Sequence, residues 1–121
     1  MKVKVNKAST YPLDYHFRGK RMVIKPLFDE LTSKLAKEVD FEYKIGKAYI
    51  GLMKTLVFAC IRIQTQKIIF EFTSRQELKS PRFNKILHFQ KDRWAYFLDI
   101  KSSEDIDKEL IDWVTESGDL D

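Results

Sequence analysis

The first long apolar segment of the chain has the period of a helix. Its apolar side chains recur at Ile24, Leu27, Phe28, Leu31 and Leu35, the 3.6-residue spacing of an amphipathic helix. Pro26 fits only the first turn of a helix, where its missing N–H has no partner to lose. The helix therefore either begins near Lys25 or begins near Met22 and bends.

After Val39 the apolar period changes from 3.6 to 2, which is typical of strands. Alternating or continuous apolar runs occur at residues 40–46, 55–63, 67–74, 86–90 and 94–100, and "KAYIGLM" lies between the first two runs. Short connections predict that residues 55–73 form one antiparallel hairpin and residues 86–100 a second. The polar segment "RQELKSPRFNK" between the hairpins is expected to be a flexible loop.

The last segment predicts a helix with start and stop signals. Ser102 or Ser103 can cap it, and acidic residues follow in the first turn, where the helix dipole favours them. Its buried stripe is expected at Ile106, Leu110, Trp113 and Val114. We expect Gly118 to close the C-terminus in a left-handed conformation.

These elements predict a single α+β domain over residues 1–121. A twisted antiparallel sheet of about five strands would carry an N-terminal and a C-terminal helix on one face and leave the other face open. Residues 1–10 form a basic arm, either an edge strand or a flexible tail, and we favour the tail.

Composition fits a soluble globular protein. Hydrophobic residues make up 44% and charged residues 33% of the chain, with one cysteine, Cys60. The N-terminus lacks the apolar segment of a signal peptide, and no apolar run approaches the roughly 20 residues that span a bilayer. We therefore expect a cytoplasmic protein that does not associate with membranes.

Charge is distributed unevenly along the chain. Residues 99–121 carry nine acids and two lysines, a net charge of −7, so the first 98 residues hold +11 of a chain total of +4. A basic body can attract phosphate backbones or acidic partners. The alternative is an ordinary solvated surface that the acidic end neutralises.

The stretch "YPLDYHFRGKR" supplies the first candidate site. His16, Arg18, Lys20 and Arg21 could bind a phosphate beside the start of the first helix, where free N–H groups favour anions. Structurally, the same stretch could anchor the chain onto the core before that helix begins. The two interpretations are compatible.

A second candidate surface is the open face of the sheet, where aromatic and basic side chains could stack and hold bases. The candidate aromatics are Tyr43, Tyr49, Trp94 and Tyr96. The cations beside them are Lys44, Lys47, Lys54, Arg62, Arg75 and Arg93. The alternative is that the aromatics form the core and the cations its rim.

The sequence offers little for catalysis or metal binding. Cys60 lies between apolar residues, as inert buried cysteines do. The two histidines do not pair with other ligands at metal spacing, so we expect no metal site and no cofactor. Glu71 or the run Asp40, Glu42 and Lys44 could contribute to a nuclease site, but the same spacing arises on any solvent-facing strand. We name no catalytic residue.

Over roughly residues 11–117 the chain resembles a small bacterial domain of unknown function. The resemblance rests on Tyr11 to Leu13 with His16, Lys47 with Tyr49 and Ile50, Phe58 with Ala59, and the run from Ser103 to Asp107. Members are sometimes labelled predicted transport proteins, and the domain is found appended to restriction- or nuclease-type proteins. The helix–sheet–helix order is also similar to the frataxin-like fold of iron-handling proteins.

Together these observations predict a non-catalytic binding or accessory module, associated with nucleic acid or a protein partner, as a monomer or homodimer. The residues expected to bind its ligand or phosphate are His16, Arg18, Lys20, Arg21, Lys47 and Tyr49. The alternative is a metal- or small-ligand-handling protein of frataxin-like shape. In that case the acidic face of the last helix, with Asp105, Glu109, Asp112 and Glu116, would attract cations.

Overall fold

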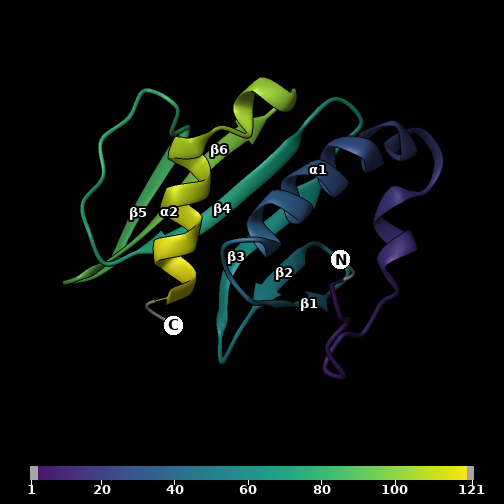
Figure 1. The fold of residues 1–121 in the computed structure, drawn as a ribbon, viewed down its shortest axis with the longest axis horizontal. Coiled ribbons are helices and arrows are strands. Elements are labelled where there is room, and N and C mark those ends of the chain that lie inside the picture. Colours follow the sequence, from purple (N-terminus) through teal and green to yellow (C-terminus); the bar gives the residue numbers. More distant parts are fainter. Residues whose placement is uncertain (1–2, 120–121) are drawn as a thin grey trace.

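The computed structural model describes residues 3–119 and shows one open antiparallel sheet with helices on one side (Figure 1). The strands are β1 (Glu42–Ile45), β2 (Ile50–Met53), β3 (Val57–Ile63), β4 (Ile68–Ser74), β5 (Lys85–Gln90) and β6 (Arg93–Ile100). They lie in the order β1-β2-β3-β4-β6-β5. The predicted α+β class is confirmed, with six strands rather than about five. The extra strand is β2, which has only four residues and contains Gly51, so its sequence signal is weak.

Both hairpins predicted from the sequence are present. β3 pairs with β4, and β5 pairs with β6 through a two-residue turn at Lys91 and Asp92. β6 also pairs with β4, so β6 lies inside the sheet and β5 forms its edge. This crossing of the chain from β4 over to β5 requires the long connection of residues 75–84.

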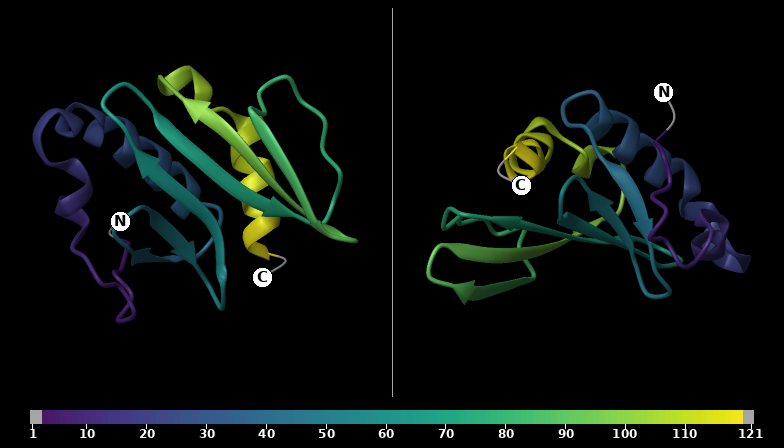
Figure 2. Two further views of the ribbon diagram at one scale, coloured as in Figure 1. Left: turned by 180° about the vertical axis from the view of Figure 1, so that it is seen from behind. Right: turned by 90° about the horizontal axis from the view of Figure 1, so that it is seen from below.

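The helices are α1 (Lys25–Ala36) and α2 (Lys108–Asp119), and they lie on the same side of the sheet in the right-hand view of Figure 2. The sheet side chains beneath them alternate as a one-sided sheet requires. In β4, Ile68, Phe70 and Phe72 are fully buried, whereas the residues between them are half exposed. The core therefore lies between the helices and one face of the sheet.

The structure decides between the two positions offered for the first helix. α1 begins at Lys25 with Pro26 in its first turn, and a 3₁₀ helix, η2 (Gly19–Ile24), precedes it. A second 3₁₀ helix, η1 (Leu13–Phe17), lies before Gly19. Gly19 has a φ of +63°, so it supplies the left-handed residue that joins the two turns.

The C-terminal helix begins later than the sequence predicts. The capping box of Ser102 and Asp105 closes a separate 3₁₀ turn, η3 (Ser103–Asp105). α2 begins afterwards, and the Asp107 side chain accepts a hydrogen bond from the Leu110 N–H at 3.0 Å, as an N-cap does. The predicted stripe is confirmed, with Ile106, Leu110 and Val114 buried and Trp113 partly so.

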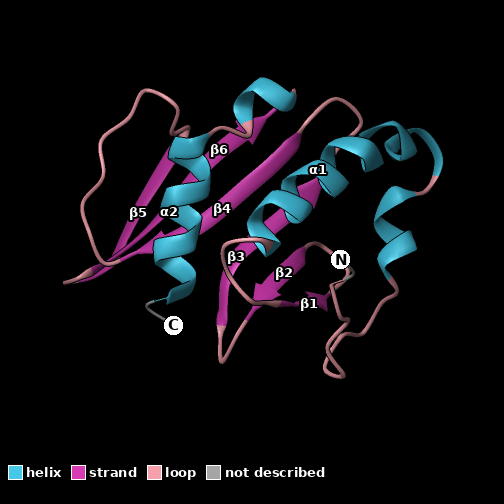
Figure 3. Cartoon of the chain, viewed as in Figure 1, coloured by secondary structure: helices cyan, strands magenta, loops and turns pink. Residues whose placement is uncertain are grey.

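The connection of residues 75–84 has no regular secondary structure (Figure 3) but is held against the fold. The Tyr96 hydroxyl donates to the Gln76 carbonyl at 2.8 Å and accepts from the Leu78 N–H at 2.6 Å. The Phe83 ring packs on Tyr96 and Trp113, at centroid distances of 4.6 and 5.0 Å. The sequence predicts a flexible loop here, but the aromatic residues Phe83, Tyr96 and Trp113 hold the segment against the fold.

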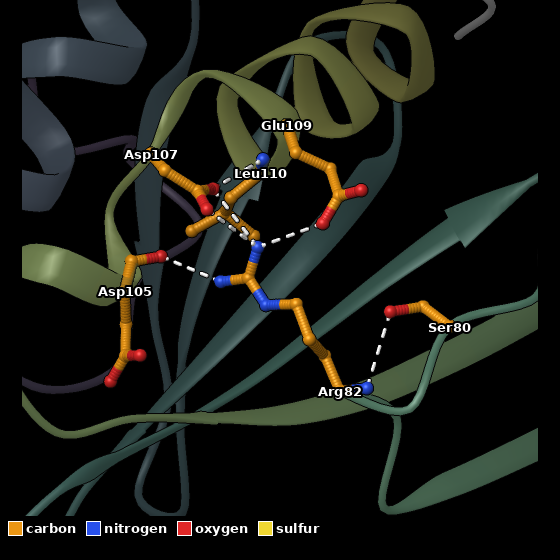
Figure 4. A network of polar contacts seen from close by, with 6 residues as sticks. All are labelled: Ser80, Arg82, Asp105, Asp107, Glu109 and Leu110. Atoms are coloured by element: carbon orange, nitrogen blue, oxygen red, sulfur yellow. Dashed lines mark hydrogen bonds and ion pairs between the residues drawn. The ribbon is translucent and has the colours of Figure 1, made fainter.

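Arg82 completes the attachment of this connection to the start of α2 (Figure 4). Its guanidinium donates to the Asp107 carboxylate at 2.9 Å, the Glu109 carboxylate at 3.1 Å and the Asp105 carbonyl at 2.7 Å. The arginine side chain is 22% exposed, and the two carboxylates are about half exposed. Solvent therefore screens the ion pairs, and their geometry matters more than their number.

Gly118 is not the left-handed cap that the sequence predicts. Among residues 3–119 the only glycine with positive φ is Gly19. Gly118 instead lies within the last turn of α2, where a Cβ would come 2.6 Å from Cγ2 of Val39 and 3.3 Å from the Phe58 ring. The glycine is needed because the helix approaches the sheet closely at this point.

We therefore expect Gly118→Ala to destabilise the protein although alanine is the better helix former. The overlap with Val39, whose branched side chain has few rotamers, should cost about 1–3 kcal/mol and exceed the ~1 kcal/mol gain in helix propensity. Urea denaturation would measure the change. Gly46→Ala is the control, because its new Cβ would lie 3.8 Å from the nearest atom. Equal stability of Gly118→Ala and the native protein would contradict the close approach.

Arg82→Met should lower the free energy of unfolding by about 1 kcal/mol, because the connection of residues 75–84 loses its attachment to α2 while the apolar stem is kept. Thermal unfolding would measure it. Lys108→Met is the matched control: this lysine pairs with Asp112 on an exposed helix face, where solvent screens the pair, so its loss should destabilise the protein less than Arg82→Met does. If the control is as destabilised as Arg82→Met, the network does not anchor the connection.

Candidate functional site

The six residues predicted to bind a ligand lie in two segments. His16 is in η1, Arg18 joins η1 to η2, and Lys20 and Arg21 are in η2. The other two, Lys47 and Tyr49, lie in the turn between β1 and β2, about 30 residues along the chain. We call these six residues the N-terminal corner; His16 is buried beneath it, and the other five reach its surface.

His16 brings the two segments of the N-terminal corner together. Its Nε2–H donates to the Gly46 carbonyl at 2.7 Å, and Gly46 immediately precedes Lys47. The imidazole is 2% exposed. The backbone before η1 is held to the last residue of β1, since the Thr10 and Tyr11 N–H groups both donate to the Ile45 carbonyl.

Tyr15 organises the two arginines of the corner. The Arg18 guanidinium lies 4.0 Å from the centre of the Tyr15 ring, a cation–π contact. Arg18 Nε and Arg21 Nη2 both donate to the Tyr15 carbonyl, at 3.2 and 3.4 Å. The Tyr11 ring packs on Tyr15 at 4.5 Å. Each arginine thus keeps other N–H donors for a ligand while its position is restricted.

The cations of the corner are not neutralised by the fold. Arg18, Lys20 and Lys47 are exposed and Arg21 is half buried. Within residues 3–119, the ion pairs involve lysines 25, 34, 67 and 108 and Arg82, and none of them includes a cation of the corner. The corner therefore presents four positive charges to solvent, with Asp14 as the nearby acid in sequence.

Backbone donors of α1 contribute less than the sequence suggests. η2 runs directly into α1, and the Lys25 N–H already donates to the Met22 carbonyl. Pro26, in the first turn, has no N–H. Side chains rather than free amides would therefore hold an anion at this corner.

The open face of the sheet is not the aromatic platform that the sequence suggests. Tyr43 and Tyr96 are 5% and 0% exposed and belong to the core. Trp94 packs against His88, with ring centroids 4.4 Å apart. The alternative, in which these aromatics are core residues, holds for the two tyrosines. On the open face the partly buried aromatic is Phe97, and Lys85 already covers it at 5.4 Å.

No catalytic arrangement emerges on that face. Burial, and then the Glu71 carboxylate, raise the pKa of Cys60 to about 12, so its thiol carries a proton at neutral pH. Burial also raises the pKa of Glu71. β2 and β3 lie between Glu71 on β4 and Glu42 on β1, a spacing of about 14 Å at ~4.8 Å per strand. Glu71 and Glu42, which the sequence suggested for a nuclease site, therefore do not lie together in one site.

Three of the four acids expected to attract cations, Asp105, Glu109 and Asp112, have partners within the protein. Glu109 pairs with Arg82, Asp112 with Lys108, and Asp105 accepts N–H bonds from the start of η3. Residues 3–119 contain no group of three or more His, Cys, Asp or Glu side chains that could hold a metal ion. Neither α1 nor α2, in the same part of the chain, has the length and apolarity to cross a membrane.

A cavity of about 560 Å³ lies elsewhere, at the end of α1 beside β1 and β2. Its lining mixes apolar and charged side chains: Val3, Lys4, Ala36, Val39, Asp40, Phe41, Glu42, Met53, Lys54 and Thr55. None of the six residues of the N-terminal corner borders it.

His16 predicts a pH dependence of stability. Burial lowers its pKa; the hydrogen bond to Gly46 opposes this, and the charge of Arg21 adds to it. A histidine with a lowered folded pKa loses stability as pH falls below its unfolded value of about 6.5, because the unfolded chain then binds the proton more readily. We expect the urea concentration at the unfolding midpoint to decrease as the pH is lowered from 7.5 to 5.5.

His16→Gln should reduce this fall, since the amide can donate to Gly46 but does not titrate. His88→Gln is the matched control, because it makes the same substitution at the other histidine, which is exposed in β5. A fall of the same size in His16→Gln and the native protein would assign the pH dependence to other groups.

Comparison with known proteins places the chain in a family. The family described as Domain of unknown function (DUF5655) matches residues 13–120, a range that contains η1, both helices and the whole sheet. No curated protein and no solved structure matches. With that coverage, the chain belongs to the DUF5655 family of domains of unknown function.

Proposed function

We propose that the protein is a non-catalytic binding module for phosphate-bearing polyanions, with nucleic acid as the ligand class and the N-terminal corner as the contact surface. The observation that carries the proposal is the gathering of Arg18, Lys20, Arg21 and Lys47 at one corner without ion pairs among residues 3–119. When unpaired cations of this kind bind a phosphate backbone, they release the counterions condensed on the nucleic acid, and this release favours binding.

The two arginines suit phosphate better than scattered lysines would. A guanidinium presents several N–H donors in a planar fork that matches phosphate oxygens. Tyr15 holds Arg18 by ring stacking and both arginines by its carbonyl. This partial ordering lowers the side-chain entropy that each arginine would lose on binding.

The uneven charge of the chain supports the same ligand class. The first 98 residues carry a net charge of +11, while Glu109 and Asp112 of α2 are paired with Arg82 and Lys108. The resemblance to a bacterial domain appended to restriction- or nuclease-type proteins also points to DNA or RNA. We also propose that the protein acts in the cytoplasm.

The contacts expected at this corner are with backbone phosphates rather than with bases. Phosphate contacts position a protein on nucleic acid, whereas specificity needs side chains at base edges or stacked on bases. Tyr43 and Tyr96 are buried in the core and cannot stack on a base. Tyr49, half buried beside Lys47, is the aromatic that could contact a nucleotide. We therefore propose binding with little sequence preference.

No specific observation favours the alternative, a metal- or small-ligand-handling protein. Of the four acids that it would use, Asp105, Glu109, Asp112 and Glu116, the first three have partners within the protein. Asp105 accepts backbone N–H bonds, and Glu109 and Asp112 pair with basic side chains. The helix–sheet–helix order it shares with frataxin-like proteins is a property of the fold, and folds do not determine function.

Fluorescence anisotropy with labelled DNA and RNA tests the proposal. We expect micromolar binding at about 50 mM salt that weakens at least tenfold at about 200 mM, as several phosphate contacts require. Combined Arg18→Ala, Lys20→Ala and Arg21→Ala should abolish most of this affinity and reduce the slope of log K against log salt by about 2–3, since each contact contributes about 0.9.

A charge-matched control separates the corner from net charge. Combined Lys34→Ala, Lys101→Ala and Lys108→Ala removes three positive charges from exposed sites outside the corner. This variant should bind nearly as the native protein does. Equal losses in both triple variants would show that binding depends on net charge alone. Absence of binding at about 50 mM salt would contradict the proposed function.

A further inference from the structure

The two edge strands of the sheet differ in whether another part of the chain covers them. At one edge, the N-terminal segment lies along β1: Val5 forms a parallel bridge with Tyr43, whose N–H donates to the Lys4 carbonyl at 2.8 Å. The Asn6 N–H donates back to the Tyr43 carbonyl at 2.8 Å. The backbone groups of this edge are therefore satisfied within the chain.

The opposite edge, β5, has no such cover. β5 is last in the strand order and pairs only with β6 among the described strands. In the right-hand view of Figure 2, β5 is the outermost strand and lies farther from the helices than β6. All six of its residues, Lys85 to Gln90, are exposed.

The composition of β5 is unusual for an exposed edge. Ile86 is 50%, Leu87 42% and Phe89 52% exposed, and these are three of the seven large hydrophobic side chains that residues 3–119 expose. Edge strands that avoid association usually carry charges, proline or a short length. β5 carries one charge, Lys85 at its first residue, and its bulge lies at the other end, between His88 and Gln90.

We propose that β5 pairs antiparallel with β5 of a second copy of this chain, across a two-fold axis perpendicular to the sheet at Leu87. The two six-stranded sheets would then form one sheet of twelve strands, with all helices on the same side. Each Leu87 faces Leu87 of the second copy, and Ile86 faces His88 of that copy. The strand supplies both the unpaired backbone groups and the apolar side chains that β-pairing needs.

The placement of charge permits self-pairing about an axis at Leu87 and disfavours an axis at His88. A two-fold axis at Leu87 sets Lys85, the one charged residue of β5, opposite Phe89 of the second copy. Lys85 lies over the Phe97 ring of its own chain at 5.4 Å. A lysine and an aromatic ring are compatible across strands. An axis at His88 would instead set Lys85 opposite Lys91, and like charges directly opposite are destabilising.

The pairing should be weak. One six-residue strand from each chain gives an interface at the small end of specific interfaces, so we expect a dissociation constant of about 10–100 µM. The surface lies at the opposite edge from β1 and from the N-terminal corner. The proposal therefore does not depend on the proposed function, and variants of β5 leave the corner unchanged.

Sedimentation equilibrium of nuclease-treated protein, from about 5 to 500 µM, tests the proposal at about 150 mM salt. The native chain should pass from monomer to dimer over this range. Leu87→Lys should remain monomeric, because two like charges would meet at the axis. Met22→Lys is the control: it adds the same charge in η2, outside the sheet, at a site that is 66% exposed, and it should dimerise as the native chain does.

Variants of opposite charge at the axis provide the most specific test of the pairing. Leu87→Glu should also be monomeric, whereas an equimolar mixture with Leu87→Lys should dimerise again. Should the charged variants unfold, Leu87→Cys should form an intermolecular disulfide under mild oxidation, since residues at the axis face each other at bridging distance. Met22→Cys should not. A native chain that stays monomeric at 500 µM, a Leu87→Lys variant that dimerises normally, or a mixture that stays monomeric would overturn the proposal.

Discussion

Burial of one sheet face beneath two short helices is the constraint on which the rest of the structure depends. The sheet has six strands, about 24 Å across at ~4.8 Å per step. Each helix has twelve residues, about 18 Å in length at 1.5 Å per residue. α2 packs on β3 and β4 and contacts α1, so the helices shield the middle strands. Both edges of the sheet then need another solution.

The N-terminal corner follows from the solution at β1. Because the chain must cross from the edge of β1 to the start of α1, it runs through η1 and η2 past the β1–β2 turn. His16 locks this path by its bond to Gly46. The basic residues of "HFRGKR" are thereby set beside Lys47. A structural segment and a candidate binding surface are the same residues, so the two interpretations offered by the sequence are compatible.

The fold was predictable where side chains alternate or recur at one period. β4 and α2 were found because their buried residues are evenly spaced along the sequence. The position of α2's start was not, since both Ser102 and Asp107 are good caps and only tertiary packing assigns the first to η3. Gly118 shows the same limit, because its requirement comes from Val39 across the core.

The candidate site was predictable as residues but not as geometry. Charge and spacing singled out Arg18, Lys20 and Arg21, but they do not show that the Tyr15 carbonyl holds two guanidiniums. For residues 86–90 the sequence predicts an ordinary strand of a hairpin. Only the strand order, with β6 inserted next to β4, shows that β5 is an uncovered edge. Non-local pairing carries that information.

The two proposed surfaces lie at opposite edges of the sheet, and this arrangement limits how they could act together. Pairing through β5 would place the two N-terminal corners at the far ends of twelve strands, roughly 50 Å apart at ~4.8 Å per step. A linear polyanion could engage both corners only if it spans that distance, which is about 15 base pairs of duplex at ~3.4 Å each. Shorter ligands would occupy one corner and gain nothing from dimerisation, whereas longer ones would gain from the effective concentration of the second corner.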